Sequence, residues 1–263
     1  MEVIAGVVTL CNVVLCAVIG VRLRRLAART GLGPERWLAR YFLLGALVAN
    51  TLAILLYLGW SDPELALRGR AERVIHAIFL VSNALGCGAL HVFTLQTFRP
   101  QSRVARAGVG LAFGLVALGI LGTGFSEGFR VHVINGPFYW TAWIARMSVF
   151  PWMAIESLRY WRLLGRRAQL GLADPMLTNR FLLWGLWAVA VFALGSADPV
   201  ARIAYVMITG DTVVWNPGLG LPVVHATVAF TSSVGIVAGT SLFMTFFPTT
   251  RYRRWIEGRV AAR

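Results

Sequence analysis

The arginines of this chain lie almost entirely on one side of seven apolar segments, and this asymmetry constrains the fold more than any other feature of the sequence. The connections and tail that would share one face hold 19 Arg and 3 acidic residues, whereas the opposite face holds 5 Arg and 7 acidic residues. Loops rich in basic residues stay on the cytoplasmic side of a membrane. The asymmetry therefore predicts a multi-pass membrane protein with its N-terminus outside and its C-terminus in the cytoplasm.

Seven apolar runs are each long enough, at about 20 residues, to cross a bilayer as a helix. The predicted helices cover residues 3–21, 41–60, 74–98, 108–124, 139–164, 177–197 and 221–247. Pro151 predicts a kink in the fifth helix, because proline removes one backbone hydrogen bond. Asp198-Pro199 predicts the end of the sixth, and we expect the short apolar stretch 200–208 to lie in the interface or fold over the bundle. The predicted fold class is an all-α, seven-transmembrane-helix bundle over residues 1–248.

Composition supports this class and excludes others. The chain is 57% apolar and 14% charged, whereas soluble domains are about 25% charged. Its net charge of +14 is placed where anionic head groups attract it, so we expect a lipid partner and no nucleic acid. The basic residues are all Arg, which excludes a retinal Schiff base and is typical of a GC-rich bacterial gene. We therefore expect the bacterial inner membrane.

Arg146 is the one arginine that the charge count assigns to neither face, because it lies inside an apolar segment and away from its ends. It lies about eight residues from the outer helix end, roughly 10–12 Å deep at 1.5 Å per residue. Asn50 and Asn83 fall at a similar depth. Ionisable residues within a membrane mark functional sites by default, so Arg146 predicts a site for an anionic ligand that enters from outside. The alternative is a structural hub that donates hydrogen bonds to carbonyls and asparagines.

Other polar side chains extend the candidate site. His76, Asn83, Cys87 and Thr94 share one helix face at 100° per residue, and His76 and His225 both lie near the outer face. We predict a ligand pocket made by Arg146 with these histidines and the two asparagines. The alternative is that these polar groups only bond one helix to another, as Asn, Ser and Thr often do in membranes.

Enzyme and metal motifs are absent from the sequence. There is no HxxxH, HExxH, CxxC or GxSxG pattern, so we predict no catalytic residues, no metal ligands and no cofactor. Three outer-face histidines leave a metal, a haem or a pH response open as alternatives.

The segment 249–263 follows Pro248 and is basic, with Tyr252, Trp255 and Ile256 interleaved among arginines. Apolar and basic residues alternating in this way are typical of a helix that lies on a membrane surface. We predict a short amphipathic cytoplasmic tail that binds anionic lipid.

The stretch Leu170–Gly185, together with Phe98-Arg99-Pro100 and Phe246-Phe247-Pro248, resembles segments of uncharacterised bacterial seven-helix membrane proteins. The resemblance implies a seven-helix bundle and carries no activity or site residue. From the residues themselves, Asp174 and Thr178 can cap the start of the sixth helix.

The topology predicts a receptor-like protein. The leading hypothesis is a non-enzymatic membrane sensor or signalling module with a polar pocket in the outer half of the bundle and a cytoplasmic or membrane protein partner. The alternatives are a small-solute transporter or channel, and a structural subunit of a larger membrane complex.

Overall fold

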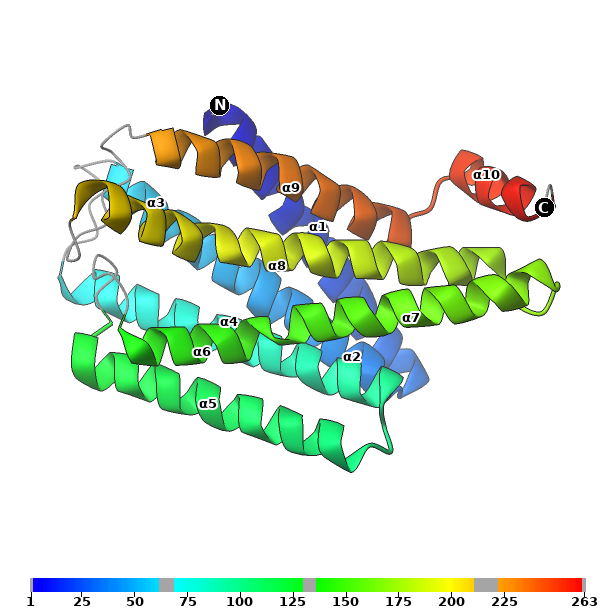
Figure 1. The fold of residues 1–263 in the computed structure, drawn as a ribbon, viewed down its shortest axis with the longest axis horizontal. Helices are drawn as coiled ribbons and strands as arrows, with labels where there is room; N and C mark the ends of the chain where they lie inside the picture. The colour runs from blue at the N-terminus through cyan, green and yellow to red at the C-terminus, as the bar shows by residue number, and fades with distance from the viewer. Residues whose placement is uncertain (1, 62–68, 130–135, 211–221, 262–263) are drawn as a thin grey trace. The chain divides into compact units, whose positions relative to one another are not determined.

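The computed structural model describes residues 2–61, 69–129, 136–210 and 222–261, and every element in these ranges is a helix (Figure 1). Six helical stretches are long and apolar enough to cross a membrane: Gly6–Thr30, Gly33–Leu56, Arg70–Phe98, Arg103–Ser126, Pro175–Ile208 and His225–Phe246. These stretches support a multi-pass membrane protein, as the sequence predicted.

The helices follow the predicted segments and are mostly longer. They are α1 (Glu2–Thr30), α2 (Gly33–Arg40), η1 (Tyr41–Val48), α3 (Ala49–Ser61), α4 (Arg70–Phe98), α5 (Arg103–Glu127), α6 (Pro137–Met147), α7 (Val149–Gln169), α8 (Pro175–Thr209), α9 (Pro222–Phe246) and α10 (Thr250–Ala261). The element η1 is a π-helix, in which the backbone N–H of Ala49 donates to Leu44, five residues earlier. Helix ends carry expected signals: Ser102 accepts from the backbone N–H of Ala105, and Asp174 accepts from that of Met176.

The fifth predicted helix is interrupted at Ser148, between α6 and α7. Pro151 has no N–H to donate to the carbonyl of Met147, four residues earlier, and its ring crowds that carbonyl. The interruption therefore falls one turn before the proline that predicted a kink. Because of it, neither half alone is long and apolar enough to cross a membrane.

The predicted end of the sixth helix at Asp198-Pro199 is wrong. Helix α8 continues through Pro199 to Thr209, so the stretch 200–208 is its last turns and not a separate interfacial segment. One hydrogen bond is lost at the proline, and unwinding the helix in an apolar setting would leave more backbone groups unpaired. The extension places Arg202 on a helix instead of in a loop.

The structure divides into two compact units. One comprises residues 13–149 and 198–227 and the other comprises residues 1–12, 150–197 and 228–263. We call them the α4 unit and the α7 unit, after a central helix of each, and describe each separately.

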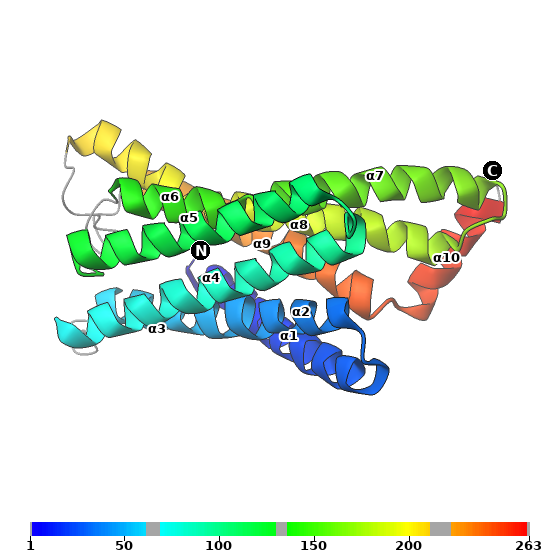
Figure 2. The ribbon, with the colours of Figure 1, turned by 90° about the horizontal axis from the view of Figure 1, so that it is seen from below.

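In the α4 unit, α4 packs against α2, η1, α3, α5 and α6, and α5 and α6 lie side by side (Figures 1 and 2). Its closest backbone approach joins Gly86 of α4 to Gly45 of η1, where a Cβ built on Gly45 would lie 3.0 Å from the Gly86 Cα. Glycine allows two membrane helices to approach this closely. On α5, Gly119 faces Ala142 of α6, whereas Gly110 and Gly114 have no atom within 4 Å of a built Cβ.

In the α7 unit, aromatic side chains join the helices. Phe150 and Trp187 pack edge to face, as do Trp184 and Phe246, and Tyr160 stacks on Phe181. The start of α1 packs against α9, where the Asn12 amide donates to the carbonyl of Gly235 at 3.2 Å. These contacts place α7 and α9 on opposite sides of the aromatic residues of α8.

The predicted tail is helical over α10 and is tied to the same unit. The Asn179 amide donates to the Tyr252 hydroxyl at 2.6 Å, and Ile256 is buried. Trp255 is exposed and stacks on Tyr252. Two of the three side chains that we expected in the membrane surface are thus partly or fully covered by the chain itself.

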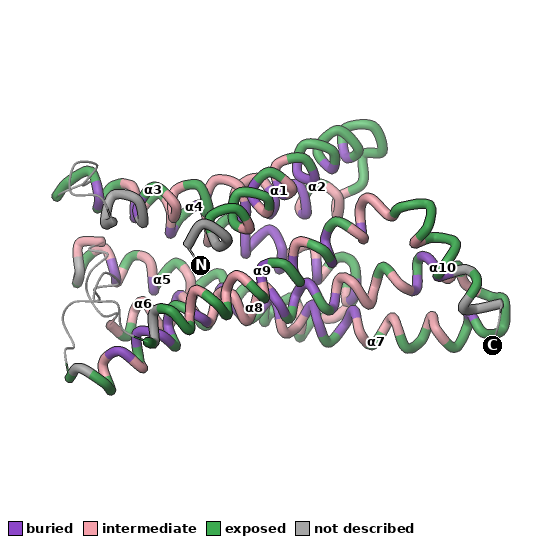
Figure 3. The backbone as a smooth tube through the Cα atoms, turned by 90° about the horizontal axis from the view of Figure 1, so that it is seen from above, coloured by how far each residue is buried: buried purple, intermediate pink, exposed green. Residues whose placement is uncertain are grey.

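Large apolar side chains remain exposed over much of the surface. On α5, these include Leu111, Leu118 and Leu121. Figure 3 shows exposed positions along the described part of α1. A membrane helix turns such residues toward lipid, so this exposure fits a chain that a bilayer solvates.

Candidate functional site

The site is built around Arg146 in the last turn of α6, where only 4% of the residue is exposed. Its Nη1 donates a hydrogen bond to Oδ1 of Asn83 on α4 at 2.8 Å, and its Nε donates to the carbonyl of Ala142 at 3.3 Å. The same Asn83 oxygen lies 3.8 Å from the Cys87 sulfur, which donates to it weakly. Residues 63 apart in sequence are therefore joined by a charge-assisted bond.

His76 lies on the same face of α4, two turns before Asn83. Its Nδ1 is 2.8 Å from the carbonyl of Phe129. Because a carbonyl only accepts, Nδ1 carries the proton and Nε2 of the neutral ring is an acceptor. The charges of Arg146 and Arg202 both lie close enough to His76 to interact with it, so the imidazole belongs to the same electrostatic neighbourhood as Arg146.

The end of α8 contributes an ion pair to this neighbourhood. Nε of Arg202 lies 2.8 Å from Oδ2 of Asp198, one turn earlier, and Arg202 is buried while the Asp198 side chain is half exposed. Tyr139 of α6 lies within electrostatic range of Asp198, Arg202 and Arg146. Glu72, one turn before His76, is also buried.

We call these residues the polar cluster. They lie on α4, α6 and α8 of the α4 unit and comprise Glu72, His76, Asn83, Tyr139, Arg146, Asp198 and Arg202. Both signs of charge and both donor and acceptor groups are present in it. Such a set can bind a small polar or anionic molecule and can hold its charges in a low-dielectric setting.

The structure brings together three of the five predicted ligand-binding residues: Arg146, Asn83 and His76. It places Asn50 at an exposed position in the first turn of α3 and His225 at an exposed position in the first turn of α9. Equal depth on two helices does not fix the direction in which a side chain points. The site therefore centres on α4 and α6, and a ligand role for Asn50 and His225 stays a prediction.

Sequence reasoning missed Arg202 and Glu72, because both were assigned to loops. A signal for each was present. Asp198 and Arg202 are four residues apart, as are Glu72 and His76, and that spacing places side chains on one helix face. Reading Pro199 as a helix end concealed the first pair.

A second polar contact fixes the interruption between α6 and α7. His91, which is buried in α4, has Nδ1 2.9 Å from the carbonyl of Cys87 and Nε2 3.1 Å from the Ser148 hydroxyl. Nδ1–H donates to the Cys87 carbonyl, and Nε2 lies within hydrogen-bond distance of the Ser148 hydroxyl, whose oxygen is also 2.8 Å from the carbonyl of Ala145. Ser148 is the residue at which the helix is interrupted, so α4 holds both Arg146 and this interruption.

Within the described ranges, no three His, Cys, Asp or Glu side chains lie close enough to share a metal ion. Cys11, Cys16 and Cys87 are all free thiols.

Comparison of the chain with protein-family models, curated proteins and solved structures gives no match in any of the three, so the site is interpreted from its own geometry.

Proposed function

We propose that the chain is a non-enzymatic sensor of the bacterial inner membrane, with seven crossings, its N-terminus outside and its C-terminus in the cytoplasm. The interrupted pair α6 and α7 would supply the crossing that completes the six apolar helices. Together the pair covers Pro137 to Gln169, which is long enough for a bilayer even with a break. The excess of arginine on one face, 19 against 5 on the other, supports this orientation.

The observation that carries the sensor proposal is the buried guanidinium of Arg146, which Asn83 and the carbonyl of Ala142 hold between α4 and α6. A guanidinium has five N–H donors, and within the described part of the chain Arg146 uses two of its three nitrogens, on Asn83 and Ala142. A buried cation gains from every further acceptor it meets. A small carboxylate or phosphate bound at Nη2 would complete the shell, with the nearby charge of Arg202 adding to the attraction.

Ligand binding at Arg146 would directly affect how the helices around it pack. Helix α7 begins at Val149, three residues after Arg146. Helix α4 contacts Arg146 through Asn83 and contacts the α6–α7 interruption through His91. A ligand that draws the guanidinium away from Asn83 would change how α6 sits on α4. We propose that a cytoplasmic or membrane protein partner at the arginine-rich face senses this change.

A subunit of a larger membrane complex is the second candidate, and one observation favours it. Gly110 and Gly114 form an uncovered small-residue face on α5, with Leu111 exposed between them. Helices of a neighbouring subunit can approach such a face closely. A protein that always purifies from native membrane with the same second protein in fixed stoichiometry would favour the subunit.

The test of the sensor uses thermal unfolding of the purified protein in detergent, followed by tryptophan fluorescence, with acetate, succinate and inorganic phosphate as probes. At least one anion should raise the Tm of the wild type. Arg146→Met should remove that rise. Arg106→Met, which removes an exposed arginine on α5, is the matched control and should keep it.

Asn83→Asp separates a ligand site from a structural hub. It keeps an acceptor for Nη1 and adds a negative charge that competes with an anionic ligand. The ligand site predicts a folded, stable protein that no longer responds to the anion. A wild type that responds to none of the probes, or an Asn83→Asp variant that responds as well as the wild type, would reject the anion-sensor proposal.

A further inference from the structure

The second half of α1 carries charge of one sign only. Residues 3–34 contain no acidic side chain, yet Arg22, Arg25 and Arg29 all lie in this range. Their spacings of three and four residues place them on one face of the helix, and all three are exposed. The first acid that follows, Glu35, lies 2.6 Å from the Thr30 hydroxyl.

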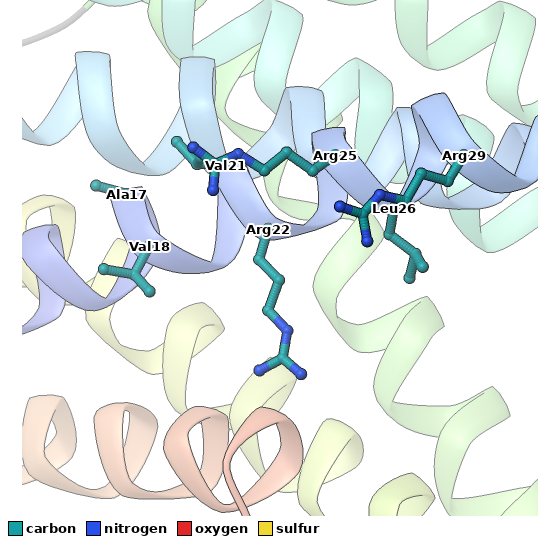
Figure 4. Close-up of a pocket in the computed structure, with 7 residues that line it drawn as sticks. All are labelled: Ala17, Val18, Val21, Arg22, Arg25, Leu26 and Arg29. Carbon is teal, nitrogen blue, oxygen red and sulfur yellow. The ribbon is translucent and has the colours of Figure 1, made fainter.

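A groove of about 760 Å³ runs along this face of α1. The three arginines line one part of it, and the apolar side chains of Ala17, Val18, Val21 and Leu26 line the rest (Figure 4). In Figure 4 the guanidinium of Arg22 projects away from the helix, whereas those of Arg25 and Arg29 extend along it. From Ala17 to Arg29 the groove spans roughly 18 Å at 1.5 Å per residue.

The two parts of the groove require different partners. Like charges four residues apart on a helix repel each other, so an anion with several acceptor oxygens would stabilise Arg25 beside Arg29. The valines and leucine need hydrocarbon. An anionic phospholipid carries both, with its phosphate at one end and its acyl chain at the other, in the order that this face of α1 presents.

We propose that this groove is a binding site for one anionic phospholipid. Arg25 and Arg29 hold the head-group phosphate, Arg22 adds to the attraction, and an acyl chain lies along Val18, Val21 and Ala17 toward the apolar start of the helix. The site shares no residue with the polar cluster, so the proposal does not depend on the sensor function. It also goes beyond a general attraction of the basic face for anionic membranes, because it assigns a stoichiometry of one and a named face.

The experiment measures lipid retained by the full chain in mild detergent by native mass spectrometry. The probes are dioleoylphosphatidylglycerol, dioleoylphosphatidylcholine and glycerol 3-phosphate. The wild type should retain one phosphatidylglycerol in preference to phosphatidylcholine and should not retain glycerol 3-phosphate. The Arg25→Gln/Arg29→Gln variant should bind phosphatidylglycerol roughly 30-fold more weakly, since each of the two basic residues removed contributes about 1 kcal/mol near the surface.

Two further variants make the result specific. Arg103→Gln/Arg106→Gln removes two exposed arginines from α5 and should leave the retained lipid unchanged. Val21→Trp keeps every charge but fills the apolar part of the groove, and it should also reduce binding. Equal loss in both arginine pairs would show general surface attraction and overturn the site. Glycerol 3-phosphate retained as tightly as the lipid would show a site for free phosphate, and unchanged binding in Val21→Trp would remove the acyl chain from the groove.

Discussion

Arg146 shows how one side chain can be both anchored and available. Its bonds to Asn83 and Ala142 fix the guanidinium between α4 and α6 and leave N–H groups directed elsewhere. In a low-dielectric setting the loss of a single acceptor costs more than it would in water. The bond to Asn83 should therefore be measurable as stability, whatever the cluster binds.

We expect Asn83→Ala to lower the free energy of unfolding by roughly 1–2 kcal/mol, because the Arg146 guanidinium loses the acceptor oxygen of Asn83. Asn83→Asp should restore most of this loss through an ion pair. Tryptophan fluorescence during thermal unfolding in detergent would measure both. If the alanine variant unfolds at the wild-type temperature, the bond at 2.8 Å contributes nothing to stability.

Counting residues along apolar segments placed both Asn50 and Asn83 at the depth of Arg146, because depth in a membrane follows from helix rise, and the structure joins Arg146 to Asn83. It could not predict that Asn50 and His225 are exposed, since depth does not determine rotation about the helix axis. Nor could it place Arg202 and Glu72 in the site, because Arg202 depends on where α8 ends and Glu72 on where α4 begins. The depth of a residue could therefore be predicted from the sequence, whereas the direction in which its side chain points could not.

At the scale of helices, the closest packing depends on glycines in no recognisable motif. Gly45 and Gly86 lie on different helices and have no GxxxG partner that faces the same contact. Of the two GxxxG pairs in the sequence, Gly235 and Gly239 of α9 face Val8 and Asn12 of α1, whereas Gly110 and Gly114 of α5 have no neighbouring atom within 4 Å of a built Cβ. Spacing along one helix shows that close approach is possible, and only the partner helix decides where it occurs.

Gly86→Ala should lower the free energy of unfolding by roughly 1–3 kcal/mol, because its new methyl group would overlap the backbone of Gly45 and helices must move apart. Gly114→Ala is the matched control on α5. With no atom within 4 Å of the new methyl group, it should leave stability unchanged or raise it by up to about 1 kcal/mol. Equal effects of the two substitutions would contradict the packing of η1 on α4.

The interrupted fifth helix and the extended sixth helix each differ from the prediction at a proline. Pro151 interrupts a helix near the point where it predicted only a kink, and Pro199 ends no helix. The surroundings of the two prolines differ. His91 of α4 is within hydrogen-bond distance of Ser148, the residue at the interruption, so a neighbouring helix contacts the break. Apolar length predicted where helices are, and tertiary partners decided which proline breaks one.

At the scale of the whole molecule, the arginine asymmetry is the property that sequence alone states most fully. It rests on counts in connections and not on packing, so the internal details of the fold do not alter it. The observed helices are mostly longer than the predicted ones, so many of the counted residues lie within helix ends instead of in connections, among them Arg22, Arg25 and Arg29 of α1 and Arg202 of α8. The count itself depends only on the order of the segments along the chain, so this lengthening does not change it.

Topology is therefore the prediction that most directly tests the chain as a whole. In a background with Cys11, Cys16 and Cys87 replaced by Ala, single cysteines are introduced at Ser126, Gln101 and Gln169, all exposed at helix ends. An impermeant maleimide added to intact cells should label Ser126→Cys, whereas Gln101→Cys and Gln169→Cys should react only after permeabilisation, because arginine-rich connections remain in the cytoplasm. Ser126 and Gln101 flank the same helix, α5, so opposite labelling of the two also shows that α5 crosses the membrane.

The reverse pattern would invert the orientation and would place the arginines of α1 at the outer leaflet. Labelling of both residues in intact cells would remove α5 from the set of crossings, and an odd number of crossings could then no longer be reached through α6 and α7.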